Sequence, residues 1–170
     1  DGRIIGDRDS LLDLDTLPKS LTIIGAGVIG CEYATIFGAL GTKVTIIDRR
    51  KKLLRFLDTD ILDTLCNSMR NSGIRVMQQE EVSGVRIEDQ NRYREGIVYL
   101  ESGRTVRSER VLVAAGRVSK IEALDLDRIG LPTDQTGLIK VDEDYQADVE
   151  GVYAVGDVIG FPALVSTSMH

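Results

Sequence analysis

The chain has 170 residues, of which 42% are hydrophobic and 28% are charged, and its formal net charge is −6. This length and composition predict a soluble globular protein with one domain, or with one domain and a piece of another. The negative charge argues against nucleic acid or an anionic membrane as a partner, because both require a basic surface, and no apolar run approaches the roughly 20 residues that span a bilayer.

The first 17 residues are polar and rich in aspartate, and we interpret residues 1–17 as a linker that enters the first domain. They lack the basic and then apolar layout of a signal peptide. The chain also begins without methionine, which indicates a piece cut from a longer protein.

Strands and helices alternate along residues 21–77. Short apolar or β-branched runs predict the strands, and apolar positions at helical spacing predict the helices between them. This alternation with short connections is typical of a doubly wound parallel sheet. The predicted elements are strands at 21–24, 43–48 and 74–77, a helix that begins at Val28 and stops at Gly41, and a helix that Asp58 caps and that ends at Asn71, Ser72 and Gly73.

The pattern changes after residue 81. Alternating side chains predict strands at 82–88, 96–101 and 104–108, which we interpret as an antiparallel β-meander laid onto the parallel sheet. A further buried strand begins at Arg110. Residues 119–150 have the turn signals of irregular structure, and the sequence GVYAVGD at 151–157 predicts one more short strand.

Three glycines follow the first strand with the spacing GxGxxG, at Gly25, Gly27 and Gly30. A strand before this pattern and a helix after it are the context of a dinucleotide-binding loop. Gly25 permits the tight turn, Gly27 lets the backbone approach a pyrophosphate, and Gly30 lets the helix lie close to the sheet. The helix N-terminus adds free N–H groups and a partial positive charge. The sequence therefore predicts that a dinucleotide binds here.

Asp48 ends the second strand, where an acid accepts hydrogen bonds from the adenosine ribose hydroxyls. A carboxylate repels a 2′-phosphate, which favours NAD(H), but Arg49 and Arg50 follow at once, and arginine forks suit a phosphate. The cluster therefore predicts a pocket that tolerates NADP(H) if Asp48 turns away. The alternative is that the two arginines are solvated in a surface loop.

Glu32 and the cysteines each allow more than one interpretation. Glu32 lies two residues beyond Gly30, in the first turn of the predicted helix, where its carboxylate would lie near the nicotinamide or would simply be favoured by the positive end of the helix dipole. Cys31 and Cys66 lie too far apart for a redox pair or a metal site, and we expect two buried free thiols in a reducing cytoplasm.

Four stretches, in this order, resemble the flavoprotein pyridine nucleotide-disulfide oxidoreductase family: GAGVIGCEYATIF (25–37), RKKLLRFLD (50–58), VAAGR (113–117) and VYAVGDVIGFP (152–162). Members carry an FAD domain that is interrupted by a Rossmann-like NAD(P) domain and followed by a dimerisation domain. The resemblance therefore implies a linker from the FAD domain at 1–17, an NAD(P)-binding domain at 18–118, and a connection with a partial FAD-binding segment at 119–170. The strand at 151–157 would then lack its sheet, and we expect it to be mobile, to dock against a neighbouring chain or to fold back on its own domain.

The resemblance also implies which residues bind the cofactors. No residue of this segment is assigned a catalytic or metal-binding role. Asp157 would bond a hydroxyl of the FAD ribitol chain, and the stretch after it would pass the flavin. The implied NAD(P) contacts are Gly25, Ala26, Gly27, Val28, Ile29, Gly30, Glu32, Asp48, Val82 and Gly116, and the implied FAD contacts are Asp157, Ala163, Leu164, Val165 and Ser166.

Within the family, the likeness is strongest to members that move a hydride between NADPH and NAD+ through FAD. One alternative is a dihydrolipoamide dehydrogenase-like disulfide reductase, which would have a strict NAD preference and a cysteine pair upstream of this segment. Another is a dinucleotide-binding module without a redox role. The implied full-length enzyme is a cytoplasmic homo-oligomer joined through a C-terminal domain, with dinucleotides as its small-molecule partners. The segment alone is expected to hold no tight FAD and to be inactive.

Overall fold

The computed structural model describes residues 4–7, 11, 14–90, 93–116 and 118–160. The chain divides into two compact units, Asp1–Gly116 and Arg117–His170. Each unit has its own apolar core, and each is described by itself below.

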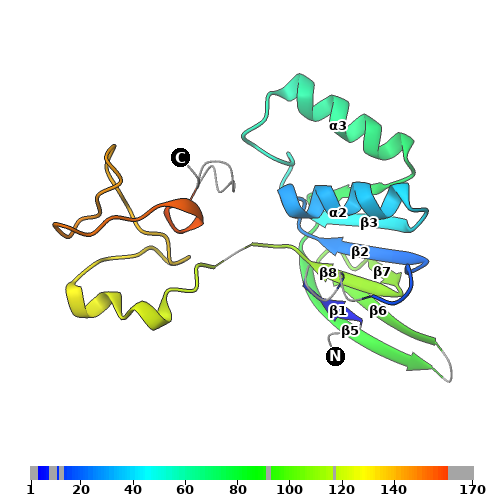
Figure 1. Ribbon diagram of the computed structural model, residues 1–170. Coiled ribbons are helices and arrows are strands. Elements are labelled where there is room, and N and C mark those ends of the chain that lie inside the picture. Colours follow the sequence, from blue (N-terminus) through cyan, green and yellow to red (C-terminus); the bar gives the residue numbers. More distant parts are fainter. Residues whose placement is uncertain (1–3, 8–10, 12–13, 91–92, 117, 161–170) are drawn as a thin grey trace. The chain divides into compact units, whose positions relative to one another are not determined.

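Five parallel strands form the central sheet of the first unit, in the order β1-β8-β2-β3-β4 (Figure 1). The central strand β2 pairs with β3 on one side and with β8 on the other, so that Ile24 lies beside both Ile47 and Val113. This sheet confirms the predicted α/β fold class. Its strands are β1 (Ile5–Gly6), β2 (Ser20–Ile24), β3 (Lys43–Asp48), β4 (Arg75–Gln78) and β8 (Arg110–Val113).

Two helices cover one face of this sheet (Figure 1). Helix α2 (Val28–Ala39) buries Cys31, Ala34 and Phe37, which recur at helical spacing. Helix α3 (Thr59–Asn71) has Asp58 at the predicted N-cap position, where its side chain forms no capping hydrogen bond, and buries Leu62, Cys66 and Met69. Both cysteines are free and buried, as predicted for their side chains. Burial raises the pKa of the Cys31 thiol to about 11, so this side chain stays neutral.

The antiparallel meander covers the opposite face, which makes three layers. Val98 is fully buried between the meander and the sheet, and Val111 of β8 packs in the same cluster. The predicted meander is therefore confirmed. Its strands are β5 (Val82–Gln90), β6 (Tyr93–Leu100) and β7 (Thr105–Ser108).

The entering segment differs from the expected linker at two places, the strand at Ile5 and Gly6 and the buried side chain of Leu11. Ile5 and Gly6 form the edge strand β1, which pairs in parallel with Val111 and Leu112, and Ile4 is only 3% exposed. A strand of two residues carries no periodicity, and its partner lies more than 100 residues away in the sequence. Ile5 and Gly6 thus belong to the sheet, while Ile4 and Leu11 are buried in the first unit.

The second unit is irregular, as expected for most of its length. Short apolar stretches pack around Leu131, Ile139, Ala147 and Ala154. The structure describes three 3₁₀ turns here, η1 (Glu122–Leu124), η2 (Leu126–Ile129) and η3 (Gly156–Ile159).

The strand predicted at 151–157 does not form, which is a correction to the sequence analysis. Tyr153 makes an isolated bridge to Gln146, the Ala154 N–H donates to the Tyr145 carbonyl at 3.0 Å, and Gly156 begins η3. The segment therefore folds back on its own unit, one of the three outcomes expected for a strand without its sheet. Within the described ranges, no helix combines the length and the apolar character needed to cross a membrane.

Candidate nucleotide-binding site

A cavity of about 510 Å³ opens at the carboxyl ends of β2, β3 and β8 in the first unit. The chain runs outward from β2 to β3 and β4 on one side, while β8 lies on the other side. The cavity thus lies where the strand order reverses, which is where open α/β sheets bind their ligands. Its lining residues are Ile24, Gly25, Gly27, Ile47, Asp48, Arg49, Arg50, Glu80, Glu81, Val82, Ala114, Ala115 and Gly116.

Two of the loop glycines are required by close packing. Gly25 has a φ of +102°, and a Cβ there would lie 2.5 Å from the carbonyl oxygen of Ala114. A Cβ on Gly30 would lie 1.9 Å from the carbonyl oxygen of Gly25, while its nearest contact on the sheet, Ile23, is 3.5 Å away. Gly30 therefore holds the helix against the glycine loop itself, more tightly than against the sheet.

Gly27 is different, because a Cβ there would meet no protein atom within 4 Å. Gly27 is the N-cap of α2 and lines the cavity. The space over this residue is therefore open at the point where the helix presents its N–H groups, and a phosphate fits such a site. This open space over Gly27, called the open cradle below, is the observation that makes the pocket compatible with the pyrophosphate of a dinucleotide.

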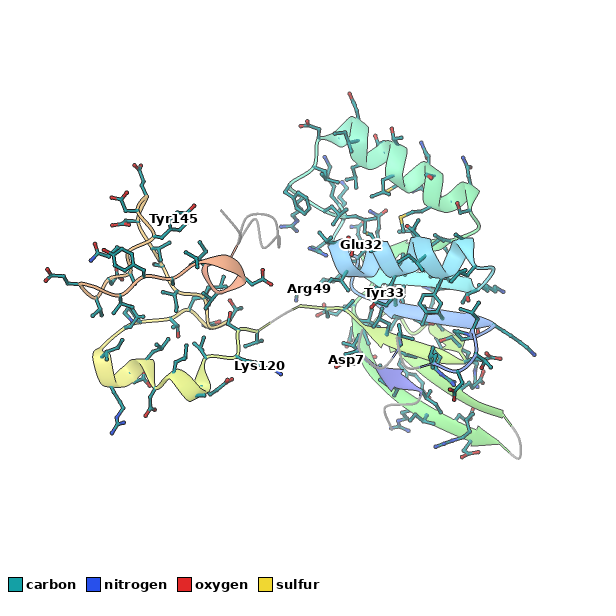
Figure 2. All side chains as sticks on the ribbon, viewed as in Figure 1. Asp7, Glu32, Tyr33, Arg49, Lys120 and Tyr145 are labelled. Atoms are coloured by element: carbon teal, nitrogen blue, oxygen red, sulfur yellow. The ribbon has the colours of Figure 1, made fainter. Side chains whose placement is uncertain are left out.

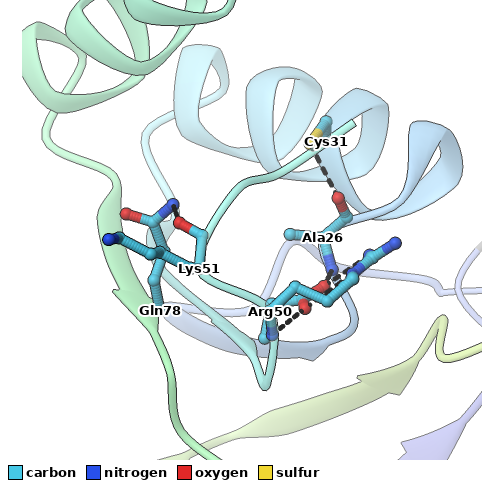
Figure 3. A network of polar contacts seen from close by, with 6 residues as sticks. Ala26, Cys31, Arg50, Lys51 and Gln78 are labelled. Carbon is cyan, nitrogen blue, oxygen red and sulfur yellow. Dashed lines mark hydrogen bonds and ion pairs between the residues drawn. The ribbon is translucent and has the colours of Figure 1, made fainter. Parts of the chain in front are cut away.

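Asp48 is buried, with 5% exposure, and both of its carboxylate oxygens accept hydrogen bonds. Oδ2 accepts from the Ala26 N–H and from Nη2 of Arg50, at 2.7 and 2.6 Å. Oδ1 accepts from the backbone N–H and from Nε of Arg50, both at 2.8 Å. Burial would raise the pKa of Asp48, but these bonds outweigh it and hold the pKa below its usual value. Figure 3 shows Arg50 beside Ala26 in this network.

The two arginines have different roles in the structure. The Arg50 guanidinium is held on Asp48, and this contact raises the pKa of Arg50. Arg49 is exposed at the rim of the cavity, beyond the end of β3 (Figure 2). One of the two is therefore a counter-ion of the acid, and the other faces solvent beside it.

Glu80 is a buried pocket residue that the sequence analysis missed. Its carboxylate pairs with Arg104 and accepts a 2.7 Å hydrogen bond from the Ser102 hydroxyl, both in the segment that joins β6 to β7. Its N–H donates to the carbonyl oxygen of Asp48 at 3.1 Å. The signal was present, because Glu80 follows the carboxyl end of a predicted strand and such ends meet at one edge.

The cavity brings together seven of the residues that were implied or predicted as NAD(P) contacts. The prediction that Glu32 lies in the first turn of the helix is wrong, because the first turn of α2 contains no acidic residue; Glu32 lies in the second turn with its side chain exposed (Figure 2). Ala26 acts on the site through its N–H bond to Asp48. The residues that line the cavity are Gly25, Gly27, Asp48, Arg49, Arg50, Val82 and Gly116, and those that do not are Ala26, Val28, Ile29, Gly30 and Glu32.

On the flavin side, the structure describes only one of the expected contacts. Asp157 is exposed in the first turn of η3 in the second unit. Residues Ala163, Leu164, Val165 and Ser166 lie outside the described residues. Among the residues that are described, no group of three His, Cys, Asp or Glu side chains is placed to hold a metal ion.

A parallel sheet with a glycine-rich loop at its switch point, an open helix N-terminus and an acid at the end of the next strand is the arrangement of a Rossmann-type fold. A sequence model of the pyridine nucleotide-disulphide oxidoreductase family matches residues 2–170. The chain belongs to this family, whose members depend on FAD and on NAD(H) or NADP(H).

Curated relatives and solved structures agree with this assignment. The chain is 45% identical over 164 residues to a soluble pyridine nucleotide transhydrogenase of Photorhabdus laumondii and 42% identical over 164 residues to one of Mycobacterium bovis. The matches cover 96% of this chain but 34% of each relative, so the chain spans about a third of their length.

Two solved structures have closely similar folds. The HOCl-induced flavoprotein disulfide reductase RclA from Escherichia coli matches with a TM-score of 0.85 and 27% identity, over 97% of this chain and 37% of that one. LpdA from Mycobacterium tuberculosis matches with a TM-score of 0.86 and 28% identity, over 99% of this chain and 36% of that one.

Proposed function

We propose that the first unit binds NAD(H) and NADP(H) in the cavity at the carboxyl ends of the strands. The pyrophosphate lies over Gly27 at the N-terminus of α2, and the adenosine ribose lies toward Asp48 and the two arginines that follow it. The observation that carries this proposal is the open space over Gly27, in a loop whose other two glycines are closely packed. The ion pair between Asp48 and Arg50 supports weak discrimination between NAD(H) and NADP(H), because the charge of the acid is already balanced.

For the whole protein, we propose a transhydrogenase of the Si-specific type that moves a hydride between NADPH and NAD+. Bound FAD supplies the redox chemistry that takes up the hydride and passes it on. The residues of this chain bind and orient the nicotinamide nucleotide, and none of them acts as an acid or a base in that step. The names of the curated relatives support this proposal. We further propose that the whole protein is cytoplasmic and homo-oligomeric.

The similarity to RclA favours a second candidate, a flavoprotein disulfide reductase. Such an enzyme uses a closely spaced cysteine pair, and the two cysteines of this chain are free and buried in the core of the first unit. Sequencing the gene upstream of this segment separates the candidates. A cysteine pair there favours the reductase, and its absence favours the transhydrogenase.

The binding proposal is tested by calorimetric titration of the 170-residue chain with NAD+, NADH, NADP+ and NADPH. We expect dissociation constants in the micromolar range, with a modest preference between the two nucleotide types. The variant Gly27→Ala places a methyl group in the open cradle and is expected to weaken binding of all four nucleotides about tenfold or more. The matched control is Gly84→Ala, which also adds a methyl group in open space but lies in β5 outside the cavity lining. Wild-type chain that binds neither nucleotide would contradict the proposal.

A further inference from the structure

The Asp48 carboxylate has no acceptor position left. A carboxylate offers about four lone-pair sites, two on each oxygen. The four hydrogen bonds to Asp48 come from the Ala26 N–H, the Arg50 N–H, and Nε and Nη2 of Arg50, two on each oxygen. The hydroxyls of an adenosine ribose therefore find this acid fully occupied.

Two of these four donors are fixed, and two can leave. The N–H groups of Ala26 and Arg50 belong to the backbone of the glycine loop and of the residues that follow β3. The guanidinium of Arg50 is held by side-chain contacts alone, and its side chain is 34% exposed at the open cavity, so it can turn away from the acid toward solvent. Its departure frees one acceptor on each oxygen. Those two acceptors match the 2′- and 3′-hydroxyls of one ribose.

A 2′-phosphate meets the opposite situation. With Arg50 in place, the negative charge of Asp48 is cancelled within the site, and the repulsion that an uncompensated acid exerts on a phosphate is removed. The guanidinium can also turn its fork from the carboxylate to the phosphate, since both are recognised by the same planar geometry. Arg50 thus opposes one nucleotide and assists the other.

We propose that Arg50 determines the nucleotide specificity of this pocket, as a built-in competitor of the NAD(H) ribose for Asp48 and as the counter-ion that admits the 2′-phosphate of NADP(H). This inference rests on the proposed binding function of the cavity. In the NAD(H) complex Arg50 leaves Asp48, and in the NADP(H) complex it stays near the acid or bonds the phosphate. Asp48 itself does not have to turn away.

The test compares Arg50→Gln with Arg55→Gln by titration of NAD+ and NADP+ into the 170-residue chain. Arg55 follows Arg50 in the same connecting segment, is exposed and does not line the cavity, so its variant removes the same charge without touching Asp48. In Arg50→Gln we expect about fivefold tighter NAD+ and about tenfold weaker NADP+ binding, with Arg55→Gln within about twofold of wild type for both. For 2′-deoxy-NAD+, which lacks one hydroxyl, the gain in Arg50→Gln should be smaller.

These titrations distinguish an error in the role of Arg50 from an error in the proposed binding function of the cavity. If wild-type chain binds neither nucleotide, the binding function is wrong. If it binds both and Arg50→Gln shifts the two affinities in the same direction, or not at all, the role of Arg50 is wrong. Should the glutamine variant fail to fold, the NMR signal of the Arg50 Nε–H decides in wild-type chain. It should change when NAD+ saturates the site, and an unchanged signal would overturn the inference.

Discussion

The hydroxyl of Ser108 forms a buried hydrogen bond of 2.8 Å with the hydroxyl of Thr22, across 86 positions of the sequence. Ser108 ends β7 in the meander, and Thr22 lies in the central strand β2 of the parallel sheet. The Glu109 N–H also donates to the Ser20 hydroxyl at 3.0 Å. The meander is therefore attached to the parallel sheet by satisfied polar contacts as well as by its apolar face.

Close packing of the meander on β8 predicts that Gly96→Ala is destabilising. A Cβ on Gly96 would lie 2.5 Å from Cγ2 of Val111, a short side chain held in the core. We expect the free energy of unfolding to fall by about 1–3 kcal/mol, the usual cost of overpacking. The matched control is Gly84→Ala in the same meander, where a Cβ meets nothing within 4 Å. Urea unfolding followed by circular dichroism measures both, and equal stabilities would contradict the described packing.

Substitutions at the last two glycines of the glycine loop, Gly27 and Gly30, should separate an effect on binding from an effect on folding. Gly27 has a φ of −77° and open space for a methyl group, so Gly27→Ala should cost less than about 1 kcal/mol of unfolding free energy, the loss expected from placing alanine at a helix N-cap. Gly30→Ala forces a methyl group against the Gly25 carbonyl and should cost about 1–3 kcal/mol. Thermal unfolding of the three chains measures the contrast. A strongly destabilised Gly27→Ala chain would show that the cradle is not open.

The Asp48 network predicts a pH-dependent contribution to stability. The folded pKa of Asp48 lies below its ordinary value of 3.8, so its stabilisation is present above that value and is lost as the pH falls through the folded pKa. Asp48→Asn should lower the free energy of unfolding by about 1–3 kcal/mol near neutral pH. The difference from wild type should shrink below about pH 4. Urea unfolding over a pH series tests this, and a difference that does not vary with pH would count against the ionised network.

Glu80 and Glu81 both line the cavity, but only Glu80 is buried, so the two side chains should contribute differently to stability. Glu80→Ala removes the contacts to Arg104 and Ser102 and should cost about 1–2 kcal/mol of unfolding free energy. Glu81→Ala removes an exposed side chain and should change stability by less than about 0.5 kcal/mol. Chemical unfolding of both variants gives the comparison. Equal losses would mean that the link to the β6–β7 segment does not stabilise the fold.

The order of elements could be predicted because its signals are local. The run from the first strand through Gly25 to α2 combines an apolar strand, a glycine turn and helical spacing within 20 residues. Strand β1 and the segment at 151–157 have no such signal. The first is two residues long with a distant partner, and the second has strand-like residues but only an isolated bridge to pair with.

The positions of the site residues could be predicted, but their partners could not. The acid at Asp48 and the arginines after it are visible in the sequence, because the end of a strand after a glycine loop is a known binding position. Asp48 lies two residues before Arg50. Whether the Arg50 side chain turns to solvent, to a ligand or back onto Asp48 depends on the side-chain conformation, which the sequence pattern does not predict. The burial of Glu80 depends on Arg104, which lies in a different sheet layer.

The pairing of β1 with β8 has a consequence for how the first unit is connected. The Val111 N–H donates to the Ile4 carbonyl at 2.7 Å, so the peptide that leads into the sheet and the strand that leads out of it run side by side at one edge. A unit whose entering and leaving segments lie this close together can be inserted at a single loop of another domain. The domain that accepts such a unit needs to be interrupted at only one surface loop, and the path of its chain elsewhere stays unchanged.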